Sequence, residues 1–335
     1  MAAGEMERIV LARHIAGLPT PADFRLERLP IPALEEGQLL IRNSFVSCDP
    51  GTRSRLSPGA SYAPPLAPGA PVDGFCVGTV VESRNPRFAV GDRVTATGWS
   101  THVISNGRGY VLKLPALAVP ESLWIGLLGV PGMTAWFGLK RVAALAAGER
   151  VLITSAAGPV GATAGQLAKL WGASEVVGIA GGAEKCAWLR SIGFDHAVDY
   201  KAADFEAQFA AAAAPGFDVM FDNVGNAMID RALLFMKLRG RIVMSGQVAD
   251  YSTPEGAVPG IVNTREFIGK RLRMEGLLVF DDLPGFAAAQ AEMAALIEAG
   301  TLQYREEIFE GLASLPEAFC GLFTGASFGR RLVKL

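Results

Sequence analysis

The spacing of apolar and polar positions changes twice along the chain. Up to about residue 120, short apolar alternations such as residues 38–42 (QLLIR) and 77–81 (VGTVV) lie between turns rich in proline and glycine. This pattern is typical of β-structure. From about residue 124 longer apolar runs alternate with helical spacing, and from residue 301 short strand-like pieces return and end in RLVKL. The pattern therefore predicts structural boundaries near residues 124 and 301.

In the middle stretch, apolar strands alternate with helices. Strands are expected at residues 151–153, 176–180, 197–199, 219–222, 242–245 and 272–279. Helices are expected at residues 161–172, 183–192, 204–214, 228–238 and 285–300. Strands that alternate with helices in this way predict a parallel, doubly wound sheet of the α/β class.

Composition adds limits to this picture. The 335 residues are 50% hydrophobic and 19% charged, with a formal net charge of −2. Such a chain can bury a large core, which excludes a largely disordered protein, and its length predicts about two domains. The small net charge gives no sign of a nucleic-acid partner.

Nothing in the sequence indicates export or membrane insertion. The four cysteines stand far apart, at Cys48, Cys76, Cys186 and Cys320. They argue against a disulfide framework and favour a reducing cytoplasm. The charges of Glu5, Glu7 and Arg8 precede any apolar run, unlike a secretory signal. Two charge-free stretches, residues 122–139 and 151–168, are interrupted by glycine and proline, so we expect buried core and no membrane partner.

Residues 151–161 carry the most informative pattern, a strand followed by SAAGPVG and then a helix. In this context Gly158 lets the backbone approach a pyrophosphate, and Gly161 lets the helix pack closely on the strand. The N–H groups and the dipole of the helix start meet the phosphate charge. Ala156 replaces the first glycine of G-x-G-x-x-G, so a strand–helix corner without a ligand is the competing interpretation.

The end of the next strand favours NADP over NAD. An NAD site usually places an acid there to bind the ribose hydroxyl, whereas this strand ends in Gly181 and Gly182. Lys185 follows in the first turn of the helix, and Tyr200 follows the strand after it. A lysine over a glycine turn can neutralise a 2′-phosphate. The one acid nearby, Glu184, is expected to point away from Lys185.

The sequence predicts no metal site. A catalytic zinc needs about three protein ligands and a structural zinc needs four. The three histidines, His14, His102 and His196, have no cysteine at ligand spacing.

Together these pieces resemble the zinc-independent medium-chain dehydrogenases/reductases, in the branch of leukotriene 12-hydroxydehydrogenase/prostaglandin reductases, plant double-bond reductases and curcumin reductase-like enzymes. The stretches that carry the resemblance are SYAPP (61–65), LGVPGMTAWFG (128–138), residues 151–161, VVGIAGGAEKC (176–186), GFDHAVDYK (193–201), FDNVG (221–225), GRIVMSG (240–246) and RMEG (273–276). The resemblance implies a Rossmann NADP-binding domain at residues 124–300, inserted in a GroES-like partial β-barrel. That barrel, the substrate and catalytic domain, would be built from residues 1–123 and 301–335.

The resemblance also implies an activity and a partner. The family reduces the C=C bond of α,β-unsaturated ketones and aldehydes with NADPH, so the expected partner is a small hydrophobic unsaturated carbonyl compound, and the expected assembly is a homodimer. The residues implied to bind the cofactor are Thr134, Gly158, Pro159, Val160, Gly161, Gly181, Lys185, Tyr200, Asn223, Ser245, Gly246, Tyr251, Leu278, Phe280 and Ser327.

Two tyrosines are the catalytic candidates. Tyr251 matches the family's tyrosine in the loop after GRIVMSG. Hydride addition to the β-carbon drives negative charge onto the carbonyl oxygen, and a phenol, which is neutral at pH 7, can donate to that enolate or protonate it. Tyr62, in a proline-rich loop, is expected to form a wall of the substrate pocket. Either tyrosine could instead be an ordinary, partly buried aromatic residue.

Two positions depart from the family pattern. The family usually has DPYMR where this chain has DPGTR, so Gly51 replaces an aromatic pocket residue and implies a wider mouth. Ser327 stands where the family has a longer asparagine near the cofactor. Two alternatives stay open: an NADPH quinone oxidoreductase of the same superfamily, and a non-catalytic NADPH-binding protein.

Overall fold

The computed structural model describes residues 4–58, 63–254 and 256–335. The chain divides into two compact units. We call Met1–Gly126 together with Glu306–Leu335 the terminal unit, and Leu127–Arg305 the middle unit. Each is described by itself below.

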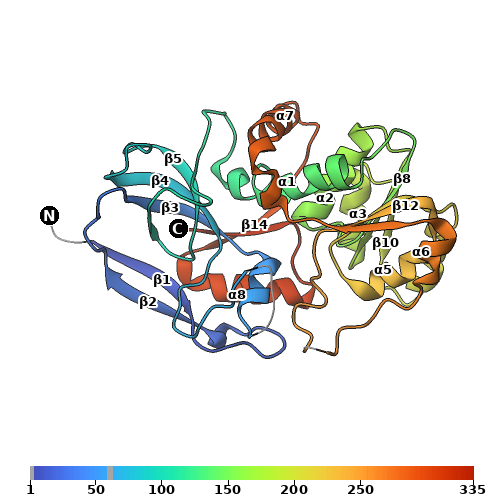
Figure 1. Ribbon diagram of the computed structural model, residues 1–335, viewed down its shortest axis with the longest axis horizontal. Helices are drawn as coiled ribbons and strands as arrows, with labels where there is room; N and C mark the ends of the chain where they lie inside the picture. Colours follow the sequence, from blue (N-terminus) through green and yellow to red (C-terminus); the bar gives the residue numbers. More distant parts are fainter. Residues whose placement is uncertain (1–3, 59–62, 255) are drawn as a thin grey trace. The chain divides into compact units, whose positions relative to one another are not determined.

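The terminal unit is built from two mainly antiparallel sheets that include both ends of the chain (Figure 1). Strands β1 (Glu5–Leu11) and β2 (Phe24–Pro30) form a hairpin sheet. A second sheet has the order β14-β15-β3-β4-β5-β7, with β6 also paired to β3. Its strands are β3 (Leu39–Ser47), β4 (Phe75–Ser83), β5 (Arg93–Thr97), β6 (His102–Ser105), β7 (Leu112–Lys113), β14 (Glu306–Glu310) and β15 (Arg330–Lys334). The C-terminal strand β15 thus lies beside β3, where Leu332 pairs with Ser47.

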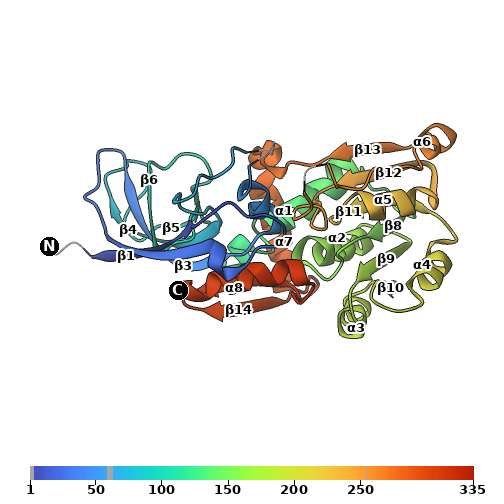
Figure 2. The same cartoon turned by 90° about the horizontal axis from the view of Figure 1, so that it is seen from below.

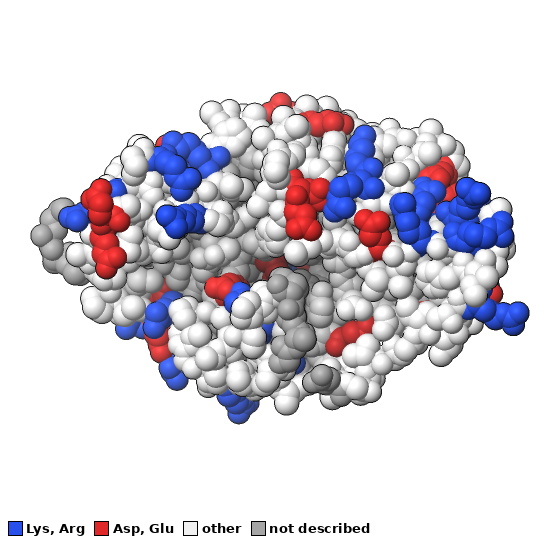
Figure 3. All heavy atoms as spheres, in the orientation of Figure 1, with Lys and Arg blue, Asp and Glu red and all other residues white. Residues whose placement is uncertain are grey.

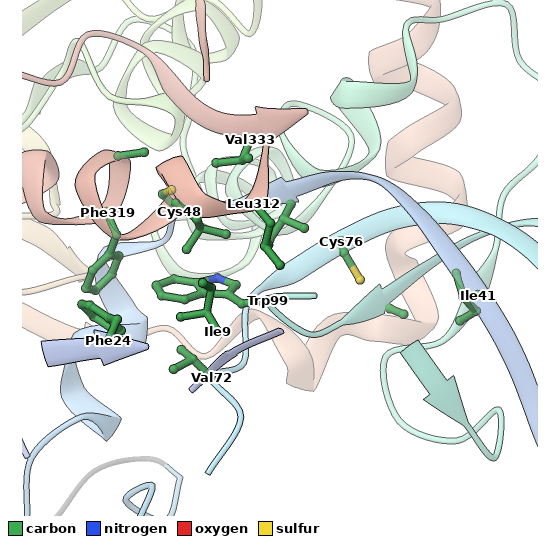
Figure 4. Packing of buried hydrophobic residues seen from close by; sticks show 14 of the residues in the cluster. Ile9, Phe24, Ile41, Cys48, Val72, Cys76, Trp99, Leu312, Phe319 and Val333 are labelled. Atoms are coloured by element: carbon green, nitrogen blue, oxygen red, sulfur yellow. The ribbon is translucent and has the colours of Figure 1, made fainter. Parts of the chain in front are cut away.

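The core of the terminal unit joins these distant segments (Figure 4). The buried ring of Trp99 lies 5.6 Å from the ring of Phe24 on β2. It also lies 5.1 Å from the ring of Phe319 on α8 (Leu315–Cys320). Its indole N–H donates to the carbonyl oxygen of Ser47, so the polar atom of this large side chain is satisfied. Residues from the N- and C-terminal parts of the chain therefore share one hydrophobic core.

The middle unit contains the predicted doubly wound parallel sheet, seen on the right of Figures 1 and 2. Its strand order is β10-β9-β8-β11-β12-β13, which is 3-2-1-4-5-6 when the strands are numbered along the chain. This is the Rossmann order. The strands are β8 (Arg150–Ile153), β9 (Glu175–Ala180), β10 (His196–Asp199), β11 (Phe217–Asp222), β12 (Met236–Met244) and β13 (Arg273–Gly276).

Helices cover both faces of this sheet. They are α1 (Val130–Phe137), α2 (Pro159–Leu170), α3 (Ala183–Ser191), α4 (Phe205–Ala213), α5 (Asn226–Leu233), α6 (Arg265–Lys270) and α7 (Phe286–Glu298). On one face, Phe209 of α4 and Ile229 of α5 pack with Leu152 and Met220 of the strands. Phe221, the next residue of β11, points to the other face because side chains alternate along a strand.

Two elements of the middle unit differ from the sequence prediction. The helix expected at residues 228–238 ends at Leu233, because Met236 already pairs with Phe217 as the first residue of β12. The strand expected at residues 272–279 ends at Gly276 and is followed by a 3-10 helix, Val279–Gly285. In both places the end of the element is set by pairing with a neighbouring strand. The spacing of apolar residues along the chain carries no information on that pairing.

The C-terminal stretch also differs from its prediction. The sequence predicts that residues 301–335 return to short strand-like pieces, but Leu315–Cys320 form helix α8. Leu315 and Phe319 stand one helical turn apart and both lie buried in the core of the terminal unit. A helix this short gives a weak periodic signal in the sequence.

The surface mixes charges of both signs. On the face shown in Figure 3, lysine and arginine side chains alternate with acidic ones over the middle unit. Arg141 pairs with Asp282 at 2.8 Å, and Lys270 pairs with Glu266 at 2.8 Å. This arrangement agrees with the small net charge of the sequence.

Candidate functional site

The strand order places the candidate site at one edge of the parallel sheet. The order in which the strands are added to the sheet reverses between β8 and β11. These two strands are neighbours in the sheet but are separated by two strands along the chain. In open α/β sheets, ligands bind outside the carboxyl ends of the strands at such a point. The segments that follow β8, β9, β10, β11 and β12 meet there.

The turn after β8 forms the corner predicted for a pyrophosphate. Ser155 adopts a left-handed φ of 48°, and the N–H of Gly158 donates to its carbonyl oxygen at 3.0 Å. Helix α2 begins at Pro159 with Gly158 as its N-cap, and no described side chain caps it. The backbone N–H groups of the first helical turn are therefore what this corner offers to an anion.

Close packing at Gly161 sets how near α2 lies to β8. A methyl group on Gly161 would lie 2.6 Å from the carbonyl oxygen of Ser155 and 2.7 Å from the Cα of Ala156. Both are backbone atoms, which cannot move aside as a flexible side chain can. Only glycine lets α2 approach β8 this closely, and this approach brings the helix start to the end of the strand.

The turn after β9 is held by an acid that ends the next strand, β10. One carboxylate oxygen of Asp199 accepts hydrogen bonds from the N–H of Gly182 at 2.7 Å and of Lys201 at 2.9 Å. The ring of Tyr200 lies against Gly181, where a methyl group would come within 2.7 Å of it. Tyr200 remains 46% exposed. The structure thus brings Gly181 and Tyr200 together, as the cofactor prediction requires.

Lys185 lies in the first turn of α3, beside this same turn. The helix begins at Ala183, directly after Gly182. The neighbouring Glu184 is 80% exposed and its carboxylate lies 3.9 Å from Arg305. The acid that could oppose a phosphate therefore has a cation of its own nearby.

A buried carboxylate, Asp222, joins the ends of β8 and β11. It accepts from the hydroxyl of Thr154 at 2.7 Å and from the N–H of Gly225 at 2.9 Å. Burial raises the pKa of Asp222 to about 6, and the nearby carboxylate of Asp250 adds to the shift. The side-chain amide of Asn223 donates to the carbonyl oxygen of Thr154 at 2.9 Å, so both residues fix the reversal point of the sheet.

The loop after β12 runs alongside the segment after β11. Its amides donate to consecutive carbonyl oxygens: Ser245 and Gly246 to Asp222, Val248 to Asn223, and Ala249 to Val224, at 2.9–3.3 Å. The parallel pairing of β11 and β12 therefore continues beyond the strands. The register of the loop is fixed by this ladder.

Tyr251 stands at the end of this ladder. Its N–H donates to the carbonyl oxygen of Gln247 at 3.1 Å. Its phenol oxygen lies 3.6 Å from the point that a methyl group on Gly246 would occupy, and the carbonyl oxygen of Asn223 lies 3.5 Å from that point. Tyr251, Gly246 and Asn223, predicted separately from the sequence, are thus brought together.

Three further predicted residues lie in the same unit. Thr134 is buried in α1, and its hydroxyl donates to the carbonyl oxygen of Val130 at 2.7 Å. Leu278 is 41% exposed and follows Leu277, whose N–H donates to the carbonyl oxygen of Met244 at the end of β12. Phe280 lies two residues further, inside the 3-10 helix.

Two predicted residues lie outside the middle unit. Ser327 belongs to the terminal unit, in the segment before β15. Tyr62 lies outside the described residues.

The chain matches known proteins over nearly its whole length. A family model described as the N-terminal domain of oxidoreductase matches residues 7–112, and one described as zinc-binding dehydrogenase matches residues 159–299. NADPH-dependent curcumin reductase of Escherichia coli is 38% identical over 98% of this chain and 96% of the relative. 2-Alkenal reductase of Nicotiana tabacum is 37% identical with the same coverage, and bovine prostaglandin reductase 1 is 38% identical over 97% of each chain. The chain belongs to the zinc-independent medium-chain dehydrogenases/reductases.

Solved structures agree with the fold. CurA from Vibrio vulnificus in complex with NADPH is 35% identical, covers 98% of both chains and superposes with a TM-score of 0.91. Quinone oxidoreductase of Escherichia coli is 23% identical with a TM-score of 0.80, a likeness that concerns the fold alone. The predicted Rossmann and GroES-like architecture of this oxidoreductase is confirmed.

Sequence reasoning missed three acids of the site. Asp199, Asp222 and Asp250 each follow a strand or precede a candidate residue, yet none was assigned a role. A signal was present, because acids directly after strands of a parallel sheet gather at its carboxyl edge. Each also accepts a hydrogen bond from a distant segment, from Gly182, Thr154 and Asn226 respectively, and no sequence pattern identifies these partners.

The described residues hold no group of three or more His, Cys, Asp or Glu side chains that could bind a metal ion. No helix among them is long and apolar enough to cross a membrane.

Proposed function

We propose that this member of the family reduces the C=C bond of α,β-unsaturated ketones and aldehydes with NADPH. Its full-length likeness to relatives named curcumin reductase, 2-alkenal reductase and prostaglandin reductase carries the proposal. The cofactor is NADP, which the relatives and the NADPH complex of CurA support together with the acid-free turn after β9.

The middle unit has the residues to hold NADP. The helix start at Gly158–Gly161 suits the pyrophosphate, because its N–H groups and dipole favour negative charge. Lys185 and Tyr200, beside the turn at Gly181, suit the 2′-phosphate. When bound, NADPH supplies the hydride that adds to the β-carbon of the substrate.

Tyr251 is the proposed catalytic residue. Hydride addition leaves an enolate, and a phenol O–H can stabilise its oxygen or protonate the α-carbon. The ladder between the loop and the segment after β11 supports this role, since a donor stabilises developing charge best when its position is fixed in advance. Tyr62 is proposed to line the substrate pocket, and Gly51 to widen it.

We further propose that the enzyme works in the cytoplasm as a homodimer. All four cysteines are free thiols and three of them are buried, which suits a reducing compartment. Light scattering of the purified protein tests the assembly.

A substrate panel tests the activity. The purified enzyme is mixed with NADPH and, separately, an alkenal, a chalcone-like enone and a benzoquinone, and NADPH oxidation is followed by absorbance. We expect turnover of the alkenal and the enone, with products that keep the carbonyl group and carry deuterium at the β-carbon when the cofactor is deuterated. Turnover of the quinone alone would indicate the quinone oxidoreductase alternative. Saturable NADPH binding without turnover would indicate a non-catalytic binding protein.

The variant Tyr251→Phe tests the catalytic role. Loss of one donor to a developing oxyanion is expected to lower kcat by about 100-fold. The Kd for NADPH should change little, because the variant keeps the ring of Tyr251 beside the cofactor and removes only the hydroxyl that acts on the substrate. Tyr304→Phe, which changes another partly exposed tyrosine of the middle unit, is the matched control. An unchanged kcat in Tyr251→Phe would remove this residue from the mechanism.

A further inference from the structure

The residue before Tyr251 is attached to a different element of the sheet edge. A carboxylate oxygen of Asp250 accepts from the N–H of Asn226 at 3.3 Å, and Asn226 is the first residue of α5. The N–H of Asp250 itself donates to the carbonyl oxygen of Gln247 at 2.9 Å. Asp250 therefore ties the end of the loop to the start of a helix.

Gly225 provides the space for this attachment. It is the N-cap of α5 and has a φ of 129°, a conformation that favours glycine. A methyl group on Gly225 would lie 2.1 Å from the bound oxygen of Asp250. The carboxylate of Asp250 can therefore reach the start of α5 only because residue 225 has no side chain.

The helix start suits a carboxylate electrostatically. First-turn N–H groups and the helix dipole stabilise negative charge, and an acid from another segment can cap a helix whose own N-cap has no side chain. Asp222 accepts from the N–H of Gly225 at the same helix start. Two acids therefore converge on the start of α5, and of these Asp250 ties the segment after β11 to the loop that carries Tyr251.

We propose that Asp250 is a positioning residue that holds the Tyr251 phenol in place through the start of α5. The last of the described backbone bonds from the loop to the segment after β11 is the one from Ala249 to Val224, and the N–H groups of Asp250 and Tyr251 donate within the loop, to Gln247. The bond from Asn226 to Asp250 fixes the residue next to Tyr251 as well. The inference rests on the proposed function of Tyr251.

A variant series with steady-state kinetics tests the inference. Asp250→Ala removes the acceptor and should lower kcat for an enone by about 10-fold to 100-fold, because small displacements of a catalytic group are costly. The KM for NADPH should stay within about twofold, because the phosphate corner is untouched. Asp250→Asn keeps an acceptor that caps helices almost as well, so its kcat should return to within about threefold of the parent. Gly225→Ala should behave like Asp250→Ala, since its methyl group displaces the carboxylate.

The decisive measurement is the same change in the Tyr251→Phe background. If Asp250 acts through the phenol, Asp250→Ala should cause no further loss of kcat there. Asp230→Ala is the matched control, because Asp230 lies on the same helix and accepts from the N–H groups of Val262 and Asn263 at 2.8 and 2.7 Å. It should lower thermal stability and leave kcat unchanged.

Each outcome bears on the inference. Additive losses in the double variant, an unchanged kcat in Asp250→Ala, or an equal loss in Asp230→Ala would overturn it while the role of Tyr251 stands. If Tyr251→Phe itself keeps full kcat, the proposed function of that residue fails first, and the inference fails with it. If Asp250→Ala does not fold, Asp250→Leu replaces it, because it too removes the acceptor, and its kcat should fall below that of Asp250→Asn.

Discussion

Two parts of the same sheet edge are held in place by different means. The corner at residues 155–161 depends on close approach, because an added methyl group at Gly161 would collide with backbone atoms at 2.6 and 2.7 Å. The loop at residues 245–251 depends on hydrogen bonds to carbonyl oxygens and to the start of α5. At Gly246, in that loop, a methyl group would meet its nearest atom at 3.5 Å, which is ordinary contact.

This difference matches what each part has to do. A phosphate corner needs backbone close to the ligand, so its geometry is set by the lack of side-chain atoms. A loop that presents a phenol needs a fixed direction, so its geometry is set by polar partners. The structure of the corner should therefore be disturbed by an added side-chain atom. The structure of the loop should be disturbed by the loss of a hydrogen-bond acceptor.

The largest effect should come from adding one methyl group to the corner. Gly161→Ala should lower the free energy of unfolding by about 3 kcal/mol or more, because rigid backbone cannot relax around the added atom. The variant should also lose most of its affinity for NADPH. Gly246→Ala, the matched change in the loop, should alter stability by less than about 1 kcal/mol. Urea unfolding and NADPH titration of both variants check this, and equal losses would contradict the comparison.

The dependence of stability on pH should test the role of the buried carboxylate of Asp222 in the part of the edge that is held by hydrogen bonds. Burial raises the pKa of Asp222 to about 6, from an ordinary value of 3.8. Between these values the folded protein takes up a proton that the unfolded chain does not, so this group adds stability as the pH falls through about 6 towards about 4. Relative to Asp222→Asn, the wild type should gain roughly 2 kcal/mol over that window.

Urea midpoints of both proteins between about pH 7 and about pH 4 measure this difference. Acids with lowered pKa, such as Asp23 and Glu175, act in the opposite direction, but they are present in both proteins and cancel. Parallel midpoint curves would show that Asp222 titrates alike in the folded and unfolded states.

The sequence predicted the close-packed part of this edge better than the polar part. Apolar strands, glycine stops and the turn at residues 155–161 are local patterns, and so is the lack of an acid at Gly181 and Gly182. The fold class, the family and the cofactor were accordingly predicted correctly.

The polar part depends on contacts between segments that are distant in the chain. Asp199 reaches the N–H of Gly182, 17 positions away, and Asp250 reaches Asn226, 24 positions away. Both contacts follow from the register of neighbouring parallel strands, which periodicity does not encode. The same register ended the helix at Leu233, before the predicted residue 238, and started β12 at Met236.

The smallest expected effect concerns the choice between NADPH and NADH, which we attribute to Lys185. Lys185 lies in the first turn of α3, and its proposed partner is the 2′-phosphate that distinguishes NADPH from NADH. Lys185→Ala should raise the KM for NADPH by about tenfold, as expected for one partly exposed charge-assisted contact, and leave the KM for NADH nearly unchanged. Urea unfolding of the variant checks that a change in KM does not come from loss of the fold. Lys169→Ala, which removes a lysine paired with Asp195 at the far end of α2, controls for the loss of one positive charge. Equal increases of KM for the two cofactors would place the selectivity elsewhere, and Tyr200, against Gly181, would then be the next residue to change.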